Sequence, residues 1–146
     1  GTIMGLYLAC TAFIEKGDVA GIGATTWESA RRSLQCAEAK VLDIPVDEYG
    51  IDTDALEEQC KRQAIRFLYV TSHHHYPSTV SLRSDRRMHL LRLSQEYGFI
   101  IFEDDYDYDF HYLSKPLLPL FGADQAGMVL CCIVGLLQNL LLRLSE

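Results

Sequence analysis

Short apolar runs alternate along the chain with segments of helical periodicity, and this alternation restricts the folds that the chain can adopt. Residues 65–70 are almost continuously apolar, as in a strand buried on both faces, and residues 99–102 have the same character. Shorter strand candidates lie at 19–22 and 41–46, with helical patterns between them. Strands that alternate with helices favour right-handed βαβ units. The sequence therefore predicts an α/β fold with a mostly parallel sheet.

Capping residues mark where the helices should begin and end. Thr26 is expected to cap one helix, and Asp52 or Thr53 the next. Ser84 is expected to cap a third helix, which Gly98 closes.

Composition limits the classes of function. A chain of 146 residues is enough for about one domain, and 49% hydrophobic with 23% charged residues fits a soluble globular protein. The net charge of −7 and a pI near 5.1 argue against nucleic-acid binding by this segment, because neutralising phosphates requires clustered Lys and Arg. The small basic groups at 31–32 and 83–87 are interpreted as solvated helix faces.

Cysteine usage and the two ends of the chain point to a cytoplasmic fragment. The five cysteines show no CxxC spacing, and reduced thiols are the simple interpretation. The apolar residues 1–13 lack a basic leader, and the Leu-rich residues 128–142 are too short to span a bilayer. Because the chain starts inside an apolar helical pattern, we interpret it as a piece of a longer protein.

Two polar segments directly follow the apolar runs. Residues 71–79 come after one expected strand and residues 103–109 after the next. In open parallel sheets ligands bind outside the carboxyl ends of the strands. We therefore expect the functional site at this edge of the sheet.

The chemistry of these segments leaves alternatives open. Five carboxylates within 103–109 repel each other unless a cation or protonated base lies among them, so the segment is either a solvated acidic loop or a metal site. The adjacent histidines of 73–75 cannot all face one metal from an extended backbone. Residues 1–3 begin a helix, whose free N–H groups can hold a phosphate, although every helix has such an end.

Three segments together resemble the middle of MocR/GabR-type proteins. Residues 70–80 are similar to the family pattern T-P-x-H-x-x-P-T-x-V, and 102–110 to I-E-D-D-Y-D-x-x-F. The paired arginines of 84–87 match the helix between them. The resemblance extends over most of residues 1–130, and E-D-D-Y-D is its most specific part. Further segments that match the family's spacing are Gly17-Asp18, Pro45-Val46-Asp47 and Gly50-Ile51-Asp52.

The resemblance implies a partial large domain of a fold-type I (class I/II) aminotransferase, truncated at both ends, with three αβα layers. It also implies pyridoxal 5'-phosphate (PLP) as the cofactor of the intact parent, bound weakly or not at all by this chain. No metal ligand is implied. The implied cofactor-binding residues are Gly1, Thr2, Ile3, Trp27, His75, Asp104 and Tyr106.

Each of these residues has a role in the family. Asp104 would pair with the pyridinium nitrogen, keeping the ring protonated as an electron sink. Tyr106 would donate to the phenolic oxygen, and residues 1–3 would hold the phosphate. Trp27 would stack on the ring, with a core tryptophan as the alternative, and His75 would neighbour the cofactor.

One departure from the family concerns catalysis. The family's Schiff-base lysine lies in a G-S-F-[ST]-K-x-L-A-P-like segment downstream of D-D-Y, and the chain has no such lysine. Lys115 matches instead a surface segment of the family. The arginine that binds the substrate carboxylate is also missing. No catalytic residue is therefore assigned, and the chain itself is expected to be inactive.

Several functions fit this pattern. The parent is expected to be a GntR/MocR-type regulator with an N-terminal winged helix, an amino-acid or amine ligand and a homodimeric state. The alternatives are a free-standing aminotransferase, or a small metal- or phosphate-binding α/β protein that uses the acidic 103–109 segment. A product without function is a further alternative.

The last residues depart from the family pattern. We expect the domain to comprise residues 1–130 and a Leu-rich tail to comprise residues 131–146. Read in another frame, the codons of the tail permit Lys followed by Leu-Ala-Pro, so we interpret the tail as a frameshift product. The alternative is a genuine Leu-rich helix.

Overall fold

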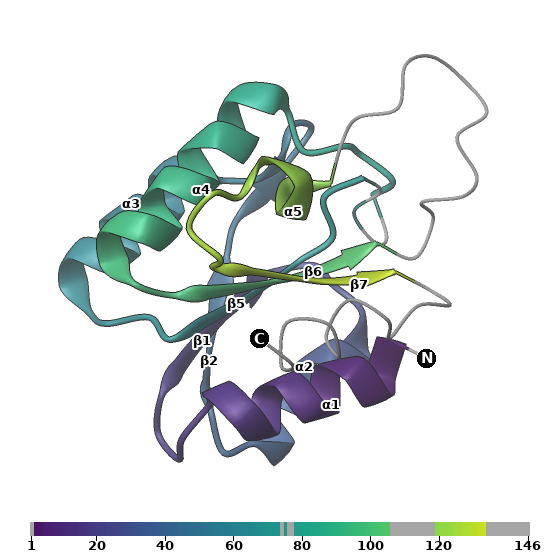
Figure 1. Ribbon diagram of the computed structural model, residues 1–146, viewed down its shortest axis with the longest axis vertical. Coiled ribbons are helices and arrows are strands. Elements are labelled where there is room, and N and C mark those ends of the chain that lie inside the picture. Colours follow the sequence, from purple (N-terminus) through teal and green to yellow (C-terminus); the bar gives the residue numbers. More distant parts are fainter. Residues whose placement is uncertain (1, 74, 76–77, 106–118, 134–146) are drawn as a thin grey trace.

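Five parallel strands form one sheet in the order β2-β1-β5-β6-β7, and two short strands, β3 and β4, pair antiparallel beside it. The computed structural model describes residues 2–73, 75, 78–105 and 119–133. The prediction of an α/β fold with a mostly parallel sheet is confirmed (Figure 1). The strands are β1 (Val19–Gly23), β2 (Lys40–Ile44), β3 (Val46–Asp47), β4 (Gly50–Ile51), β5 (Phe67–Val70), β6 (Ile100–Asp105) and β7 (Val129–Ile133).

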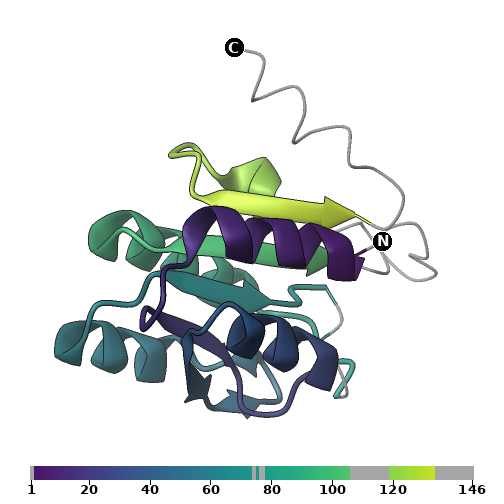
Figure 2. The same ribbon diagram turned by 90° about the horizontal axis from the view of Figure 1, so that it is seen from below.

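Helices cover both faces of the sheet and give three layers (Figures 1 and 2). On one face lie α1 (Thr2–Phe13) and α2 (Glu28–Cys36). On the other lie α3 (Thr53–Arg62), α4 (Ser84–Tyr97) and the single turn α5 (Leu120–Ala123). Within the described residues, no helix is long and apolar enough to cross a membrane.

The two faces of β5 supply two separate cores. Phe67 and Tyr69 belong to the cluster under α1 and α2, whereas Leu68 and Val70 belong to the cluster under α3 and α4. Successive side chains of a strand point to opposite faces, so a strand covered on both sides is apolar at every position. This explains the continuous apolar run at 65–70.

The expected helix caps are correct in part. Asp52 caps α3, and its Oδ1 accepts hydrogen bonds at 3.0 Å from the backbone N–H groups of residues 54 and 55. The expectations for Thr26 and Ser84 are wrong. The N-cap positions of α2 and α4 are Trp27 and Arg83, and neither side chain makes a capping hydrogen bond. Gly98 closes α4 with φ of 73°, in the left-handed region.

Two strand boundaries differ from expectation. The run at 41–46 divides at Pro45, which has no N–H to donate to a ladder, into β2 and β3. Strand β6 continues to Asp105, so the first three acidic residues of the 103–109 segment belong to the strand rather than to a loop.

Strand β7 crosses the domain boundary expected at residue 130. Its parallel ladder with β6 continues from Val129, opposite Ile101, to Ile133, opposite Asp105. Residues 134–146 of the tail lie outside the described residues, and both the boundary and the frameshift stay predictions. All five cysteines are free thiols.

Candidate functional site

Three consecutive carboxylates at the end of β6 point to different sides of the sheet. Glu103, Asp104 and Asp105 are all buried, with 0%, 3% and 2% of their surface exposed. Asp104 is bonded to a residue of the α1–α2 side, whereas Glu103 is bonded to α5 on the other side. The interpretation as a solvated loop is therefore wrong for these three residues. Residues 106–109 lie outside the described part.

Asp104 has one carboxylate oxygen bonded and one left over. Its Oδ2 accepts a hydrogen bond from the Tyr69 hydroxyl at 2.7 Å. Its Oδ1 is buried and has no hydrogen-bond partner within the described part of the chain. A buried acceptor without a partner is costly, and such atoms are concentrated at functional sites.

Burial raises the pKa of the Asp104 carboxyl from 3.8 to about 6. The hydrogen bond from Tyr69 and the nearby Thr2 side chain work in the opposite direction, and the neighbouring Asp105 adds an upward contribution to the pKa. A carboxylate that burial makes costly to ionise gains most from a cationic partner.

Thr2, Ile3 and Trp27 lie together on the α1–α2 side. They line a mostly apolar hollow between the first two turns of α1 and the length of α2, as far as Cys36. Thr2 is also close enough to Asp104 to lower its pKa, so it connects the hollow with the buried carboxylate. As the first residues of α1, Thr2 and Ile3 carry N–H groups without partners inside the helix. Gly1 and Tyr106 lie outside the described residues.

His75 lies at the end of β1. A Cβ added to Gly23 would come within 3.1 Å of its Nε2, so glycine at this position lets the ring approach β1 closely. Its Nδ1 is 2.8 Å from the Ser78 hydroxyl. Burial lowers the pKa of His75, although the Thr25 backbone partly offsets the effect. No contact of His75 with Asp104 is found among the described residues.

A second buried polar cluster lies on the opposite side of the sheet. Glu103 accepts hydrogen bonds from the Ser72 hydroxyl and from the backbone N–H groups of residues 120 and 121, at 2.9 and 3.1 Å. Arg87 of α4 donates to the carbonyls of Ser72 and Leu82, both at 2.9 Å. These hydrogen bonds hold α5 against β6, and they hold the segment after β5 against β6 and α4.

A buried histidine–aspartate contact completes this cluster. The Nδ1 of His73 is 2.8 Å from Oδ2 of Asp105, and both side chains are almost fully buried. His73 and His75 thus have different partners, Asp105 on β6 and Ser78 in the segment after β5. A metal site made from the histidine run alone does not form among the described histidines of that run.

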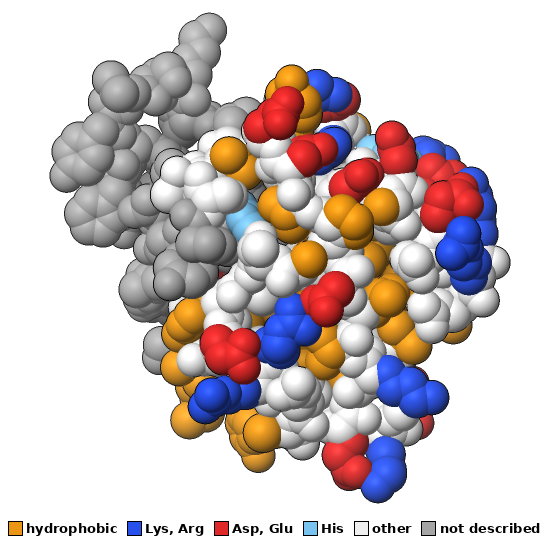
Figure 3. All heavy atoms as spheres, turned by 180° about the vertical axis from the view of Figure 1, so that it is seen from behind, with side chains coloured by type: hydrophobic (Ala, Val, Ile, Leu, Met, Phe, Trp, Pro, Cys, Tyr) orange, Lys and Arg blue, Asp and Glu red, His pale blue; other side chains and the backbone are white. Residues whose placement is uncertain are grey.

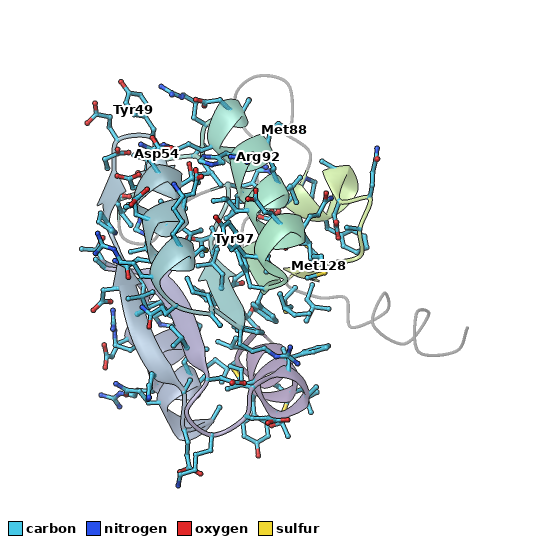
Figure 4. The ribbon with its side chains drawn as sticks, turned by 90° about the vertical axis from the view of Figure 1, so that its left-hand side faces the viewer. Tyr49, Asp54, Met88, Arg92, Tyr97 and Met128 are labelled. Carbon is cyan, nitrogen blue, oxygen red and sulfur yellow. The ribbon has the colours of Figure 1, made fainter. Side chains whose placement is uncertain are left out.

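The carboxylates of 103–105 do not converge on one point, because each has its own partner. The described residues contain one other group that could hold a metal ion, Asp54 and Glu57 on α3 with His89 on α4. Glu57 already lies 3.3 Å from Lys61 and 3.7 Å from Arg92, whose side chains neutralise it. Figure 4 shows Asp54 on α3 and Arg92 on α4, and both side chains are mostly exposed.

Tyr69 is the residue that the sequence did not reveal. It lies in the continuous apolar run at 65–70, yet its hydroxyl is the hydrogen-bond donor to Asp104. One signal was available, because a buried tyrosine needs a partner for its hydroxyl.

Comparison with known proteins supports the resemblance. No family model matches the sequence. The chain is 29% identical over 135 residues to an aromatic-amino-acid aminotransferase of Thermococcus litoralis, covering 89% of the chain and 32% of the relative. It is 28% identical over 130 residues to the probable rhizopine catabolism regulatory protein MocR of Rhizobium meliloti, covering 89% and 26%.

Solved structures agree with these sequence matches. The kynurenine aminotransferase of Pyrococcus horikoshii, solved in complex with PMP, superimposes with a TM-score of 0.87 at 28% identity. The match covers 91% of this chain and 34% of that one. The chain thus spans about a third of the length of the proteins that it matches.

Proposed function

We propose that the chain forms the part of a PLP-binding domain that holds the ring nitrogen and the phosphate of the cofactor. The chain is homologous to the fold-type I aminotransferases and to the MocR-type regulators. The homologues are PLP-dependent proteins, and the fold is theirs. Binding of PLP by this chain, and the residues that bind it, are the proposal.

The observation that carries the proposal is the unpartnered Oδ1 of Asp104. The residues present fit the cofactor at two points. The Asp104 carboxylate offers a buried acceptor to a protonated ring nitrogen, and the first turn of α1 offers N–H donors to a phosphate dianion. Thr2 lies between these two points.

In this arrangement Asp104 holds a proton on the ring nitrogen, and Thr2 and Ile3 bind the phosphate through their N–H groups. Trp27 excludes water from one side of the hollow. When bound, the cofactor supplies an electron sink for chemistry at an amino acid. Gly1, Tyr106 and His75 stay predicted contributors.

The chain offers no matching lysine to hold the cofactor covalently. We therefore propose that it binds PLP noncovalently, if weakly, and is itself inactive in transamination.

We propose a MocR-type regulator as the parent protein, a cytoplasmic homodimer that responds to an amino acid or amine. Several matched relatives are regulators of this type. The face seen in Figure 3 has acidic and basic side chains interspersed, as suits a segment that does not bind nucleic acid. A free-standing aminotransferase is the second candidate, favoured by the match to the archaeal enzymes. A basic winged helix encoded upstream would decide for the regulator.

The test is a titration of the chain with PLP, followed by the cofactor's absorbance. Asp104→Asn should weaken binding by about tenfold or more, because an amide cannot hold a charge-assisted bond. Asp105→Asn is the matched control, on the same strand but on the opposite face. The folding of each variant is first checked by circular dichroism. Equal PLP affinity of the original chain and Asp104→Asn would refute the proposal.

A further inference from the structure

We propose that Tyr69 is a positioning residue of this site, whose hydroxyl fixes the Asp104 carboxylate so that its free oxygen faces a cationic N–H donor. The inference rests on the proposed function and adds to it a residue that no family motif quoted above contains. It assigns a purpose to a polar atom inside an otherwise apolar strand.

The geometry begins with the register of β5 and β6. Tyr69 lies opposite Phe102, two residues before Asp104 on the neighbouring strand. Its ring is stacked against that of Phe102, with centroids 6.2 Å apart and planes 14° from parallel. Because the ring is held and only 2% of the residue is exposed, the hydroxyl has little freedom to leave Asp104.

The hydrogen bond makes the two oxygens of Asp104 inequivalent. Oδ2 is occupied by the Tyr69 hydroxyl at 2.7 Å, whereas Oδ1 is buried without a partner. A carboxylate can rotate about its terminal torsion, which is broad. A donor fixed on one oxygen stops this rotation and leaves the other oxygen in one place, which preorganises it for a ligand.

Among the described residues, the groups around Asp104 provide no positive charge. Asp105 on the same strand carries a like charge. Cys132 lies opposite Asp104 on β7, and burial raises its thiol pKa, which keeps it neutral near pH 7. Thr2 on α1 is uncharged. The Tyr69 hydroxyl is therefore a neutral donor, and a cationic ligand would supply a charge that no described neighbour of Asp104 carries.

The chemical consequence concerns the ionised form. A donor to the carboxylate stabilises its charged state, which is the state that binds a protonated ring nitrogen. Removing the hydroxyl should leave the fold in place, since phenylalanine keeps the stacked ring, but should make Asp104 harder to ionise and free to rotate.

The experiment compares the original chain with Tyr69→Phe by two measurements. The first follows the Asp104 side-chain carboxyl carbon by ¹³C NMR across pH without ligand, with Asp104→Asn to assign the signal. The second measures PLP affinity at pH 7. Tyr97→Phe is the matched control, because it removes a phenol from α4 on the other side of the sheet.

We expect the pH midpoint of the Asp104 carboxyl titration to move upward in Tyr69→Phe, and the PLP affinity to fall by about tenfold. Both quantities should be unchanged in Tyr97→Phe. An unmoved midpoint, or a moved midpoint with unchanged affinity, overturns the positioning role while the proposed function stands. Absence of PLP binding by the original chain overturns the proposed function instead, and the inference with it.

Discussion

The guanidinium of Arg86 donates to both carboxylate oxygens of Asp47, each at 2.7 Å. The same group donates to the carbonyls of Gly50 and Ile51, at 3.0 and 3.2 Å. One side chain of α4 thus fastens the β3–β4 pair to the helix that follows the segment after β5. Leu82 in that segment packs so closely on Gly50 that an added Cβ would come within 2.9 Å of it.

Arg86→Lys should lower the free energy of unfolding by about 1–2 kcal/mol, because an ammonium cannot form the two-point bond and reach both carbonyls. Urea denaturation measures the difference. Arg92→Lys is the matched control on the same helix, since the Arg92 side chain is 58% exposed, donates one hydrogen bond to Glu96 and lies 3.7 Å from Glu57. We expect less than about 0.5 kcal/mol there. Equal effects of the two changes would contradict this account.

The Arg86–Asp47 ion pair should make the free energy of unfolding depend on pH in a defined way. The hydrogen bond from Arg86 lowers the pKa of Asp47 below 3.8. A carboxylate with a lowered pKa in the folded state contributes stability above its ordinary pKa and loses it as the pH falls through the folded value. The difference in unfolding free energy between the original chain and Arg86→Lys should therefore be constant from pH 7 to 5 and shrink below pH 3.8. A difference that grows on acidification would contradict the assignment.

Asp104 should have the opposite effect on stability. Its pKa in the folded chain is raised to about 6 by burial, so the folded state binds the proton more tightly than the unfolded state. Stability should then fall as the pH rises from about 4 to 6 and stay level above it, with a cost of about 2–3 kcal/mol at pH 7. Asp104→Asn should remove this dependence and make the ligand-free chain more stable at pH 7, while weakening PLP binding.

Thermal melting of the original chain and of Asp104→Asn between pH 4 and 8 tests this pH dependence. A flat difference between them across this range would show that Asp104 does not titrate as described. A stabilised variant with lost binding would show that the carboxylate is kept for a ligand rather than for the fold.

The sequence predicted the strands of the sheet because burial on both faces leaves a local signature, as at 65–70. The sequence also predicts the site at the carboxyl ends of these strands, where the structure has Asp104 at the end of β6. It did not predict the bond between Tyr69 and Asp104, because this depends on the register of β5 against β6, which no local pattern encodes. For the same reason the acidic residues 103–105 could not be divided between the two faces until β6 was seen to extend through them.

The histidine run shows a similar limit. The separate partners of His73 and His75 follow from the path of the chain after β5, which the extended geometry of the run alone did not predict. The helix cap was predicted correctly at Asp52, whose side chain accepts hydrogen bonds from backbone N–H groups. It was predicted wrongly at Thr26, because the N-cap of α2 is Trp27 and its side chain makes no capping hydrogen bond.

Thr79→Gly should stabilise the chain by about 1 kcal/mol. Thr79 has φ of 59°, in the left-handed region that costs a β-branched residue most. Its N–H donates to the His75 carbonyl at 2.6 Å, so the turn is held in place despite the cost. Thr79→Ala is the matched control, because alanine also carries a Cβ and should keep most of the strain. Equal melting temperatures for the glycine and alanine variants would refute the idea.

PLP should form no stoichiometric covalent adduct with the chain. A link would need a lysine amine beside Asp104, and the described lysines lie elsewhere. Lys16 follows α1, Lys40 begins β2 and Lys61 is near the end of α3, all at the edge of the sheet opposite the carboxyl ends of the strands. Lys16 and Lys61 are also paired with glutamates, at 2.5 and 2.9 Å. Borohydride reduction of a PLP-treated sample, followed by peptide mapping, should give sparse labelling spread over several lysines. Complete modification of one lysine would show that the chain does contain the amine that the family uses.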